Sequence, residues 1–164
     1  MRGAYFMGHF VFEQMKFARA QVIRSMEDVS ADIADIVPDG FRNSIRWNLG
    51  HLYVVLERFS FQYIGLPQIM PDGFKEHFEY GTSPLHPSSA PLPSLNLLKT
   101  LLEEQPGRIE EKLLDRLQEP ATPYTTSQGM RLETPEQFLS FHLFHEGQHL
   151  NTIKLYKQML AKKK

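Results

Sequence analysis

"SFHLFHEGQHLNTI", residues 140–153, has the apolar spacing of a helix that packs into a core, yet it carries three of the chain's seven histidines. Its apolar residues recur in steps of three and four, and His142, His145 and His149 fall on the same stripe. An imidazole is costly to bury without a partner. This segment therefore predicts a helix whose packing face also contains a polar site.

The helix around this stretch has a clear start. Thr134 is an N-cap residue, a proline follows at the first helical position, and Gln137 is placed for a capping box. The segment before it begins at Ser94 and repeats apolar residues as far as Leu117. Because the apolar phase survives Pro106, we expect one kinked helix there rather than two separate ones.

The N-terminal half contains two more segments with helical periodicity. Residues 10–36 repeat apolar side chains in steps of three and four, until Pro38 and Gly40 end the pattern. A second segment begins at Ser44, which has the side chain of an N-cap, and ends at Gly65. The connection between these two helices is short, so we expect them to pack as antiparallel neighbours.

These four segments predict an all-α fold, a four-helix bundle with a long connection between helices two and three. Strand signals are weak, and we expect a single domain over residues 1–164. The connection, residues 66–93, is longer than most structureless loops. It mixes aromatic residues with turn formers, so it either folds over the bundle as a lid or rim or crosses as a plain proline-rich link.

The composition limits the possible partners. The 18 lysines and arginines nearly balance the 19 aspartates and glutamates, so nothing indicates a nucleic-acid partner. No apolar run is long enough to span a bilayer, and we expect no membrane partner. The chain has no cysteine, so any metal must be held by nitrogen and oxygen ligands, and a reducing, cytoplasmic location is expected.

Two of the histidines have the spacing of metal ligands. Helical side chains four residues apart lie about 5 to 6 Å from each other, so His145 and His149 can point at one ion. A third ligand must come from another helix, and His51 lies on the inward stripe of the second. Three imidazoles suit a divalent metal, zinc or nickel first, with iron or manganese as alternatives. Such a site leaves coordination positions open, as catalytic sites do.

Other interpretations of these histidines remain. They could be core histidines bonded to their neighbours, although one shared metal would satisfy all three at once. "HEGQH", residues 145–149, also matches the HExxH pattern of zinc peptidases, with Glu146 as general base. Gly147 inside the motif and the missing downstream ligand argue against a peptidase. Glu146 and His142 stay candidate catalytic proton acceptors, with a place on the rim for Glu146 and a packing role for His142 as the alternatives.

Four side chains near these ligands have two interpretations each. Trp47 either walls a cavity or is simply part of the core. Asn48 and Gln148 either hydrogen-bond a ligand or a metal-bound water, since the second nitrogen of a ligating imidazole needs an acceptor, or lie at the surface. Arg58, two turns after His51, either attracts a thiolate or carboxylate or forms an ion pair with a glutamate of the first helix.

Together, "NSIRWNLGHL" (43–52), "FEYGTSP" (78–84) and "HEGQHLNTI" (145–153) resemble the DinB-like proteins, also described as DinB/YfiT-type metalloenzymes. The correspondence runs over nearly the whole chain and keeps the order of the segments. In that family one histidine of the second helix and two of the last helix bind a divalent metal, which by position implies the histidines at 51, 145 and 149. The resemblance also implies a four-helix bundle of less usual handedness and frequent homodimers.

The resemblance further implies thiol-dependent transfer or isomerisation with small thiols such as bacillithiol or mycothiol. We therefore expect a metal-dependent transferase that uses a low-molecular-weight thiol of the bacillithiol type and a small-molecule substrate. Since the chain has no cysteine, that thiol must be a cosubstrate. A metal-dependent hydrolase that uses a metal-bound water is the first alternative. A non-enzymatic, stress-related binding module with a structural metal is the second.

Overall fold

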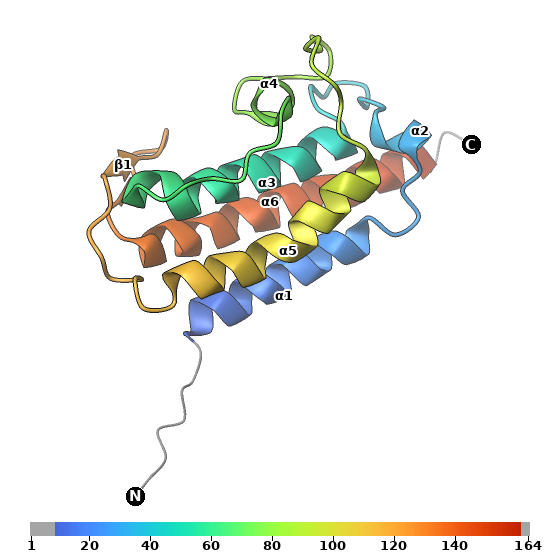
Figure 1. Ribbon diagram of the computed structural model, residues 1–164. Coiled ribbons are helices and arrows are strands. Elements are labelled where there is room, and N and C mark those ends of the chain that lie inside the picture. The colour runs from blue at the N-terminus through green and yellow to red at the C-terminus, as the bar shows by residue number, and fades with distance from the viewer. Residues whose placement is uncertain (1–8, 162–164) are drawn as a thin grey trace, which may run out of the picture.

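Four long helices form the bundle in a computed structural model of the chain, which describes residues 9–161 and leaves residues 1–8 and 162–164 outside the described part (Figure 1). The all-α prediction is confirmed, and the extent of the predicted domain, residues 1–164, stays a prediction. No helix within the described residues is long and apolar enough to cross a membrane. The four helices are α1 (Phe10–Ser25), α3 (Ile45–Phe61), α5 (Leu95–Leu113) and α6 (Pro135–Ala161).

The helices are arranged so that the first and the second long helix face each other diagonally. Both α1 and α3 pack against α5 and α6. In Figure 1, α1 and α6 run in one direction and α3 and α5 run in the other. The predicted antiparallel direction of the first two helices is therefore confirmed, but the prediction that they are neighbours is wrong. The consequence for function is that α3 lies directly beside α6, which carries the histidine-rich stretch.

The first predicted helix is too long, and this explains the wrong neighbour. It ends at Ser25, because Met26 caps it and Asp28 adopts a positive φ of 65°, which an α-helix cannot accommodate. A separate short helix, α2 (Ala31–Ala34), follows and contacts α3. The resulting connection is long enough to cross the end of the bundle, so α3 takes the diagonal position.

The predicted helix starts are confirmed by the hydrogen bonds at their N-caps. The Ser44 hydroxyl accepts a bond from the backbone N–H of Trp47 at 3.1 Å, at the start of α3. At the start of α6 the Thr134 hydroxyl accepts from the N–H of Gln137 at 3.4 Å. Pro106 lies inside α5, as expected for one continuous helix. That helix ends at Leu113, before the predicted end.

The long connection folds over the bundle, as the lid or rim interpretation expected. It contains α4 (Phe74–Phe78), which Figure 1 shows above α3. Phe74 and Phe78 are fully buried, and the Phe78 ring lies directly on Gly50 of α3. A Cβ at position 50 would lie 2.3 Å from Cγ of Phe78, so only glycine permits this contact. The contact brings the backbone of α4 to the same level of α3 as His51.

A small hairpin that the sequence did not predict covers the other end of α3. A 3-10 turn, η1 (Gln62–Ile64), extends α3, and the strands β1 (Tyr124–Thr125) and β2 (Arg131–Leu132) pair antiparallel. The N–H of Thr122 donates to the carbonyl of Tyr63 at 2.7 Å, which ties the hairpin to that turn. The hairpin thus forms a wall at one end of the groove between α3 and α6.

Candidate metal centre

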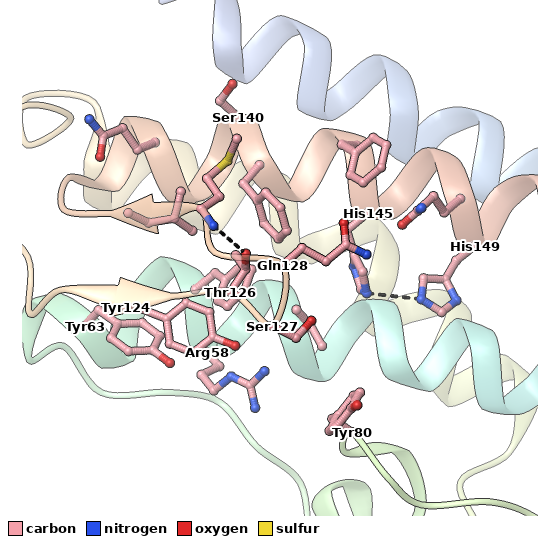
Figure 2. Close-up of a pocket in the computed structure, with 18 of the residues that line it drawn as sticks. Arg58, Tyr63, Tyr80, Tyr124, Thr126, Ser127, Gln128, Ser140, His145 and His149 are labelled. Carbon is pink, nitrogen blue, oxygen red and sulfur yellow. Dashed lines mark hydrogen bonds between the residues drawn. The ribbon is translucent and has the colours of Figure 1, made fainter.

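Three histidines converge between α3 and α6. His51 comes from α3, and His145 and His149 come from successive turns of α6, which Figure 2 shows side by side along the pocket. The ring centre of His51 lies 5.2 Å from that of His145 and 4.9 Å from that of His149, and the latter two are 4.5 Å apart. Their ligand nitrogens all lie within 4.8 Å of one another. The predicted convergence from two helices is confirmed, and the group could hold a metal ion.

Hydrogen bonds set the tautomers of two of these rings. His51 Nδ1 lies 2.7 Å from the carbonyl oxygen of Phe78, and His149 Nδ1 lies 2.6 Å from Oδ1 of Asn48. Because both oxygens can only accept, each Nδ1 must carry the proton, which leaves the Nε2 lone pairs free. His149 Nε2 and His145 Nε2 are 3.1 Å apart. Two nitrogens bound to one ion at about 2.0 to 2.1 Å are separated by roughly 3.0 to 3.4 Å, so this pair fits a shared cation.

Burial keeps the three imidazoles neutral. It lowers the pKa of His51 to about 4 and the pKa of His149 to about 3. Burial likewise lowers the pKa of His145, and the neighbouring histidines add to that effect. Metal ions bind the neutral imidazole, so the form that prevails at neutral pH is the ligand form.

His142 and Glu146, the two candidate catalytic residues, lie behind the histidine group in the bundle core. Glu146 Oε1 accepts from Arg19 Nε of α1 at 2.7 Å, and His142 Nε2 lies 3.2 Å from Glu146 Oε2. Burial raises the pKa of Glu146, but Arg19 and His142 outweigh it and lower the pKa overall. Glu146 is fully buried rather than on the rim. Neither residue is among the described residues that line the pocket, and their catalytic role stays a prediction.

The histidine group opens into a pocket of about 1420 Å³ between α3 and α6. Trp47 lines it and stacks on His51 with ring centres 4.5 Å apart, so this residue is both part of the core and a wall of the cavity. Gln148 is exposed at the pocket, whereas Asn48 is buried and bonded to His149. Coordination positions not used by the protein would therefore face a large, accessible space.

The pocket also contains features that sequence reasoning missed. Arg58 pairs with Glu79, which follows α4, at 2.5 Å, so the predicted alternative of a glutamate from the first helix is wrong. The hairpin contributes Tyr124 and the polar residues at its tip to the far wall. Its strands are two residues each, too short for a strand pattern to indicate. The pairing of Arg58 with Glu79 of the long connection also had no local pattern in the sequence that could indicate it.

Comparison with known families agrees with this geometry. The sequence model of the DinB superfamily matches residues 14–153. That range includes all three converging histidines and the long connection between α3 and α5. No curated protein matches the chain.

Proposed function

Since the chain belongs to the DinB superfamily, we propose that it is a metal-dependent enzyme in which His51, His145 and His149 hold a divalent cation. The observation that carries this proposal is the orientation of the rings. Acceptors on α3 and α4 hold Nδ1–H of two of them, so their free nitrogens point at one position beside an open pocket. Zinc and nickel suit three neutral imidazoles best, and iron and manganese are the alternatives.

We propose that the reaction is the transfer of a low-molecular-weight thiol of the bacillithiol type to a small electrophilic substrate. A divalent cation at this site would supply Lewis acidity that keeps a bound thiol deprotonated at neutral pH. The sulfur then forms a bond to the electrophilic atom, and the displaced group leaves with the electrons of its former bond. The chain has no cysteine, so the cosubstrate supplies the sulfur.

The position of the two candidate bases supports transfer over hydrolysis. Attack by water needs an acceptor for its proton, and neither candidate base lines the pocket: Glu146 is bonded to Arg19, and His142 is buried beside it. A thiol that is already deprotonated needs no such acceptor. Hydrolysis remains the alternative reaction, and a binding module with a structural metal remains the non-enzymatic one.

The metal is tested by elemental analysis of untagged protein. We expect about one divalent ion per chain, and its loss in His149→Ala without loss of helical circular dichroism. His86→Ala is the matched control, because His86 is an exposed histidine of the long connection and lies outside the group. Metal-free wild type, or a mutant that retains the full complement of metal, would contradict the proposal.

The reaction is tested by supplying candidate thiols with electrophiles and, separately, a panel of esters without thiol. Thiol-dependent turnover that disappears in His149→Ala supports the transferase. Turnover of the esters with no thiol present would replace it with the hydrolase. A metal-loaded protein that turns over neither set would favour the binding module.

A further inference from the structure

A second polar group lies in the same pocket, at the end away from the histidines. It consists of Arg58 of α3, Tyr63 of the turn η1 and Tyr124 of strand β1. Figure 2 shows the two tyrosine rings next to each other with Arg58 beside them. Two chain segments that are far apart in sequence, α3 with its extension η1 and the strand β1, thus bring a guanidinium and two phenols to one place, which we call the Arg58 cluster.

Arg58 uses only part of its hydrogen-bonding capacity. Nη1 donates to Glu79 Oε1 at 2.5 Å, while Nε is buried and has no partner. Nη2 donates to no described residue either. The guanidinium carbon lies 5.6 Å from the centre of the Phe59 ring, which supports the head group from one side. A buried donor without a partner is destabilising, so the free edge of Arg58 favours an incoming acceptor.

The two tyrosine hydroxyls add further hydrogen-bond donors and no negative charge. Their ring centres are 5.3 Å apart, and neither hydroxyl has a hydrogen-bond partner among the described residues. Within residues 9–161, the only carboxylate bonded to the Arg58 cluster is that of Glu79, whose side chain is 28% exposed and also accepts from the N–H of Tyr80. The cluster therefore has more donors than acceptors, which is the composition of an anion site.

The charge of the Arg58 cluster limits which class of anion can bind there. Arg58 carries one positive charge and already shares it with Glu79. A phosphate dianion needs more positive charge than this, whereas a carboxylate needs one guanidinium edge and a few neutral donors. A carboxylate is therefore the acceptor that fits.

The distance from Arg58 to the histidine group sets the length of a ligand that contacts both. Arg58 follows His51 by two helical turns on the same face of α3, a separation of roughly 10 Å along the axis. Val55, which lies between them on α3, lines the pocket, as do Phe59 of α3 and Phe141 of α6. A ligand that reaches both ends must have an apolar or aromatic middle of that length.

We propose that the Arg58 cluster binds a carboxylate of the substrate, so that the substrate is an elongated small molecule with a carboxylate at one end, an aromatic or apolar middle, and its reacting atom at the histidine end. This substrate class rests on the proposed function of the same pocket. Binding of the carboxylate itself does not depend on the metal.

The test compares 3-phenylpropionate with its neutral amide, 3-phenylpropanamide, as probes. Binding is followed by the fluorescence of Trp47, the chain's one tryptophan, which lines the pocket. Each titration is done with metal-loaded protein and again after chelation. We expect the acid to bind about tenfold more tightly than the amide in both forms, since a charge-assisted bond is worth at least one factor of ten.

Variants assign that preference to the cluster. Arg58→Gln should abolish the preference for the acid and leave binding of the amide and the metal content unchanged. Glu79→Gln, which removes the competing carboxylate, should tighten binding of the acid several-fold. Arg131→Gln is the matched control, because Arg131 also lines the pocket but is exposed and paired with Glu133. It should change neither affinity.

Several results would overturn the proposal. They are equal binding of acid and amide, no detectable binding of the acid, and a preference that Arg58→Gln retains. A preference that chelation removes would place the carboxylate at the metal instead, which would overturn the Arg58 cluster while leaving the metal-dependent function intact. A protein that takes up no metal when metal is supplied, yet still prefers the acid, would overturn the metal-dependent function and leave the Arg58 cluster intact.

Discussion

Asn48 Oδ1 accepts a hydrogen bond from His149 Nδ1 at 2.6 Å and so links α3 to α6 at the histidine group. The orientation of the Asn48 amide is set independently, because its Nδ2 donates to the carbonyl of Ser44 at 2.8 Å. The oxygen therefore faces His149 before any metal binds. This bond selects the tautomer in which Nε2 of His149 is the free ligand atom.

Asn48→Ala should weaken metal binding by about 10- to 100-fold, the usual effect of removing the acceptor behind a ligating histidine. The affinity is measured by competition with a chromophoric chelator. Asn48→Asp should restore most of it, since a carboxylate also accepts from Nδ1. Asn43→Ala is the control, because Asn43 lines the same pocket and bonds to none of the three histidines. An unchanged affinity in Asn48→Ala would show that this bond does not orient the ligand.

Gly50→Ala should destabilise the fold by about 1 to 3 kcal/mol, although alanine is the better helix former. The new Cβ would lie 2.3 Å from Cγ of the buried Phe78 ring, so the ring and α4 must move. Because the Phe78 carbonyl bonds to His51, metal affinity should fall as well. Gly107→Ala in α5 meets no atom within 4 Å and should be neutral or stabilising. Urea unfolding of both variants, together with metal titration, checks the pair.

Arg19→Met should cost about 3 to 5 kcal/mol of unfolding free energy, because it leaves the carboxylate of Glu146 buried without its charged partner. Lys16→Met is the matched control on the same helix. Lys16 pairs with Glu110 at an exposed position, where such pairs contribute about 0 to 1 kcal/mol. The free energies of unfolding are measured with denaturant. Equal destabilisation by the two changes would mean that the buried Arg19–Glu146 pair contributes no more to stability than the exposed Lys16–Glu110 pair.

The stability of the metal-free protein should fall as the pH is lowered from about 6.5 to 5. Burial lowers the pKa of His51 to about 4 and of His149 to about 3, against 6.5 in an unfolded chain. Between these values the unfolded chain binds more protons than the folded one, so acid favours unfolding, by at most about 1.4 kcal/mol per pH unit for each histidine. Above the unfolded pKa the contribution is fully present. Unfolding curves at several pH values, recorded with a chelator, measure the slope.

His51→Phe should reduce that slope, since one buried imidazole no longer titrates. His86→Gln should leave it unchanged, because His86 is exposed on the long connection. A pH-independent stability of the metal-free wild type over this range would contradict the burial of neutral imidazoles. Carboxylates contribute little to the pH dependence of stability between about pH 6.5 and 5, because their ordinary pKa values lie below this range.

What the sequence could predict was local. Ser44 and Thr134 mark helix starts because a cap acts within one turn, and His145 and His149 predict a shared ligand because helical spacing fixes their distance. Asp28 ends the first helix early through its backbone conformation, while apolar residues continue to recur beyond it. Periodicity cannot distinguish that case from a longer helix.

The parts that escaped prediction depend on contacts between distant segments. The partner of Arg58 is Glu79, at the end of α4, and the acceptor for His51 is a backbone carbonyl, which no side-chain pattern indicates. Glu146 matches a catalytic motif, but its carboxylate is buried in the core, where it accepts a hydrogen bond from Arg19 of α1. Each of these follows from which helices are neighbours, and that arrangement was predicted incorrectly for α1 and α3.

The chain should form a homodimer, as the family resemblance implies, and α1 offers a face for it. Phe10 and Phe17, two turns apart, are 65% and 68% exposed, and Phe144 of the neighbouring α6 is 60% exposed. Phe17→Glu should convert the dimer into a monomer, because burying a carboxylate in an apolar contact is unfavourable. Leu97→Glu, at an exposed position of α5, should not. Light scattering of the eluted protein gives the mass, for which a dimer is twice the 19.0 kDa chain. A monomeric wild type would contradict the dimer, and a dimeric Phe17→Glu variant would place its interface elsewhere.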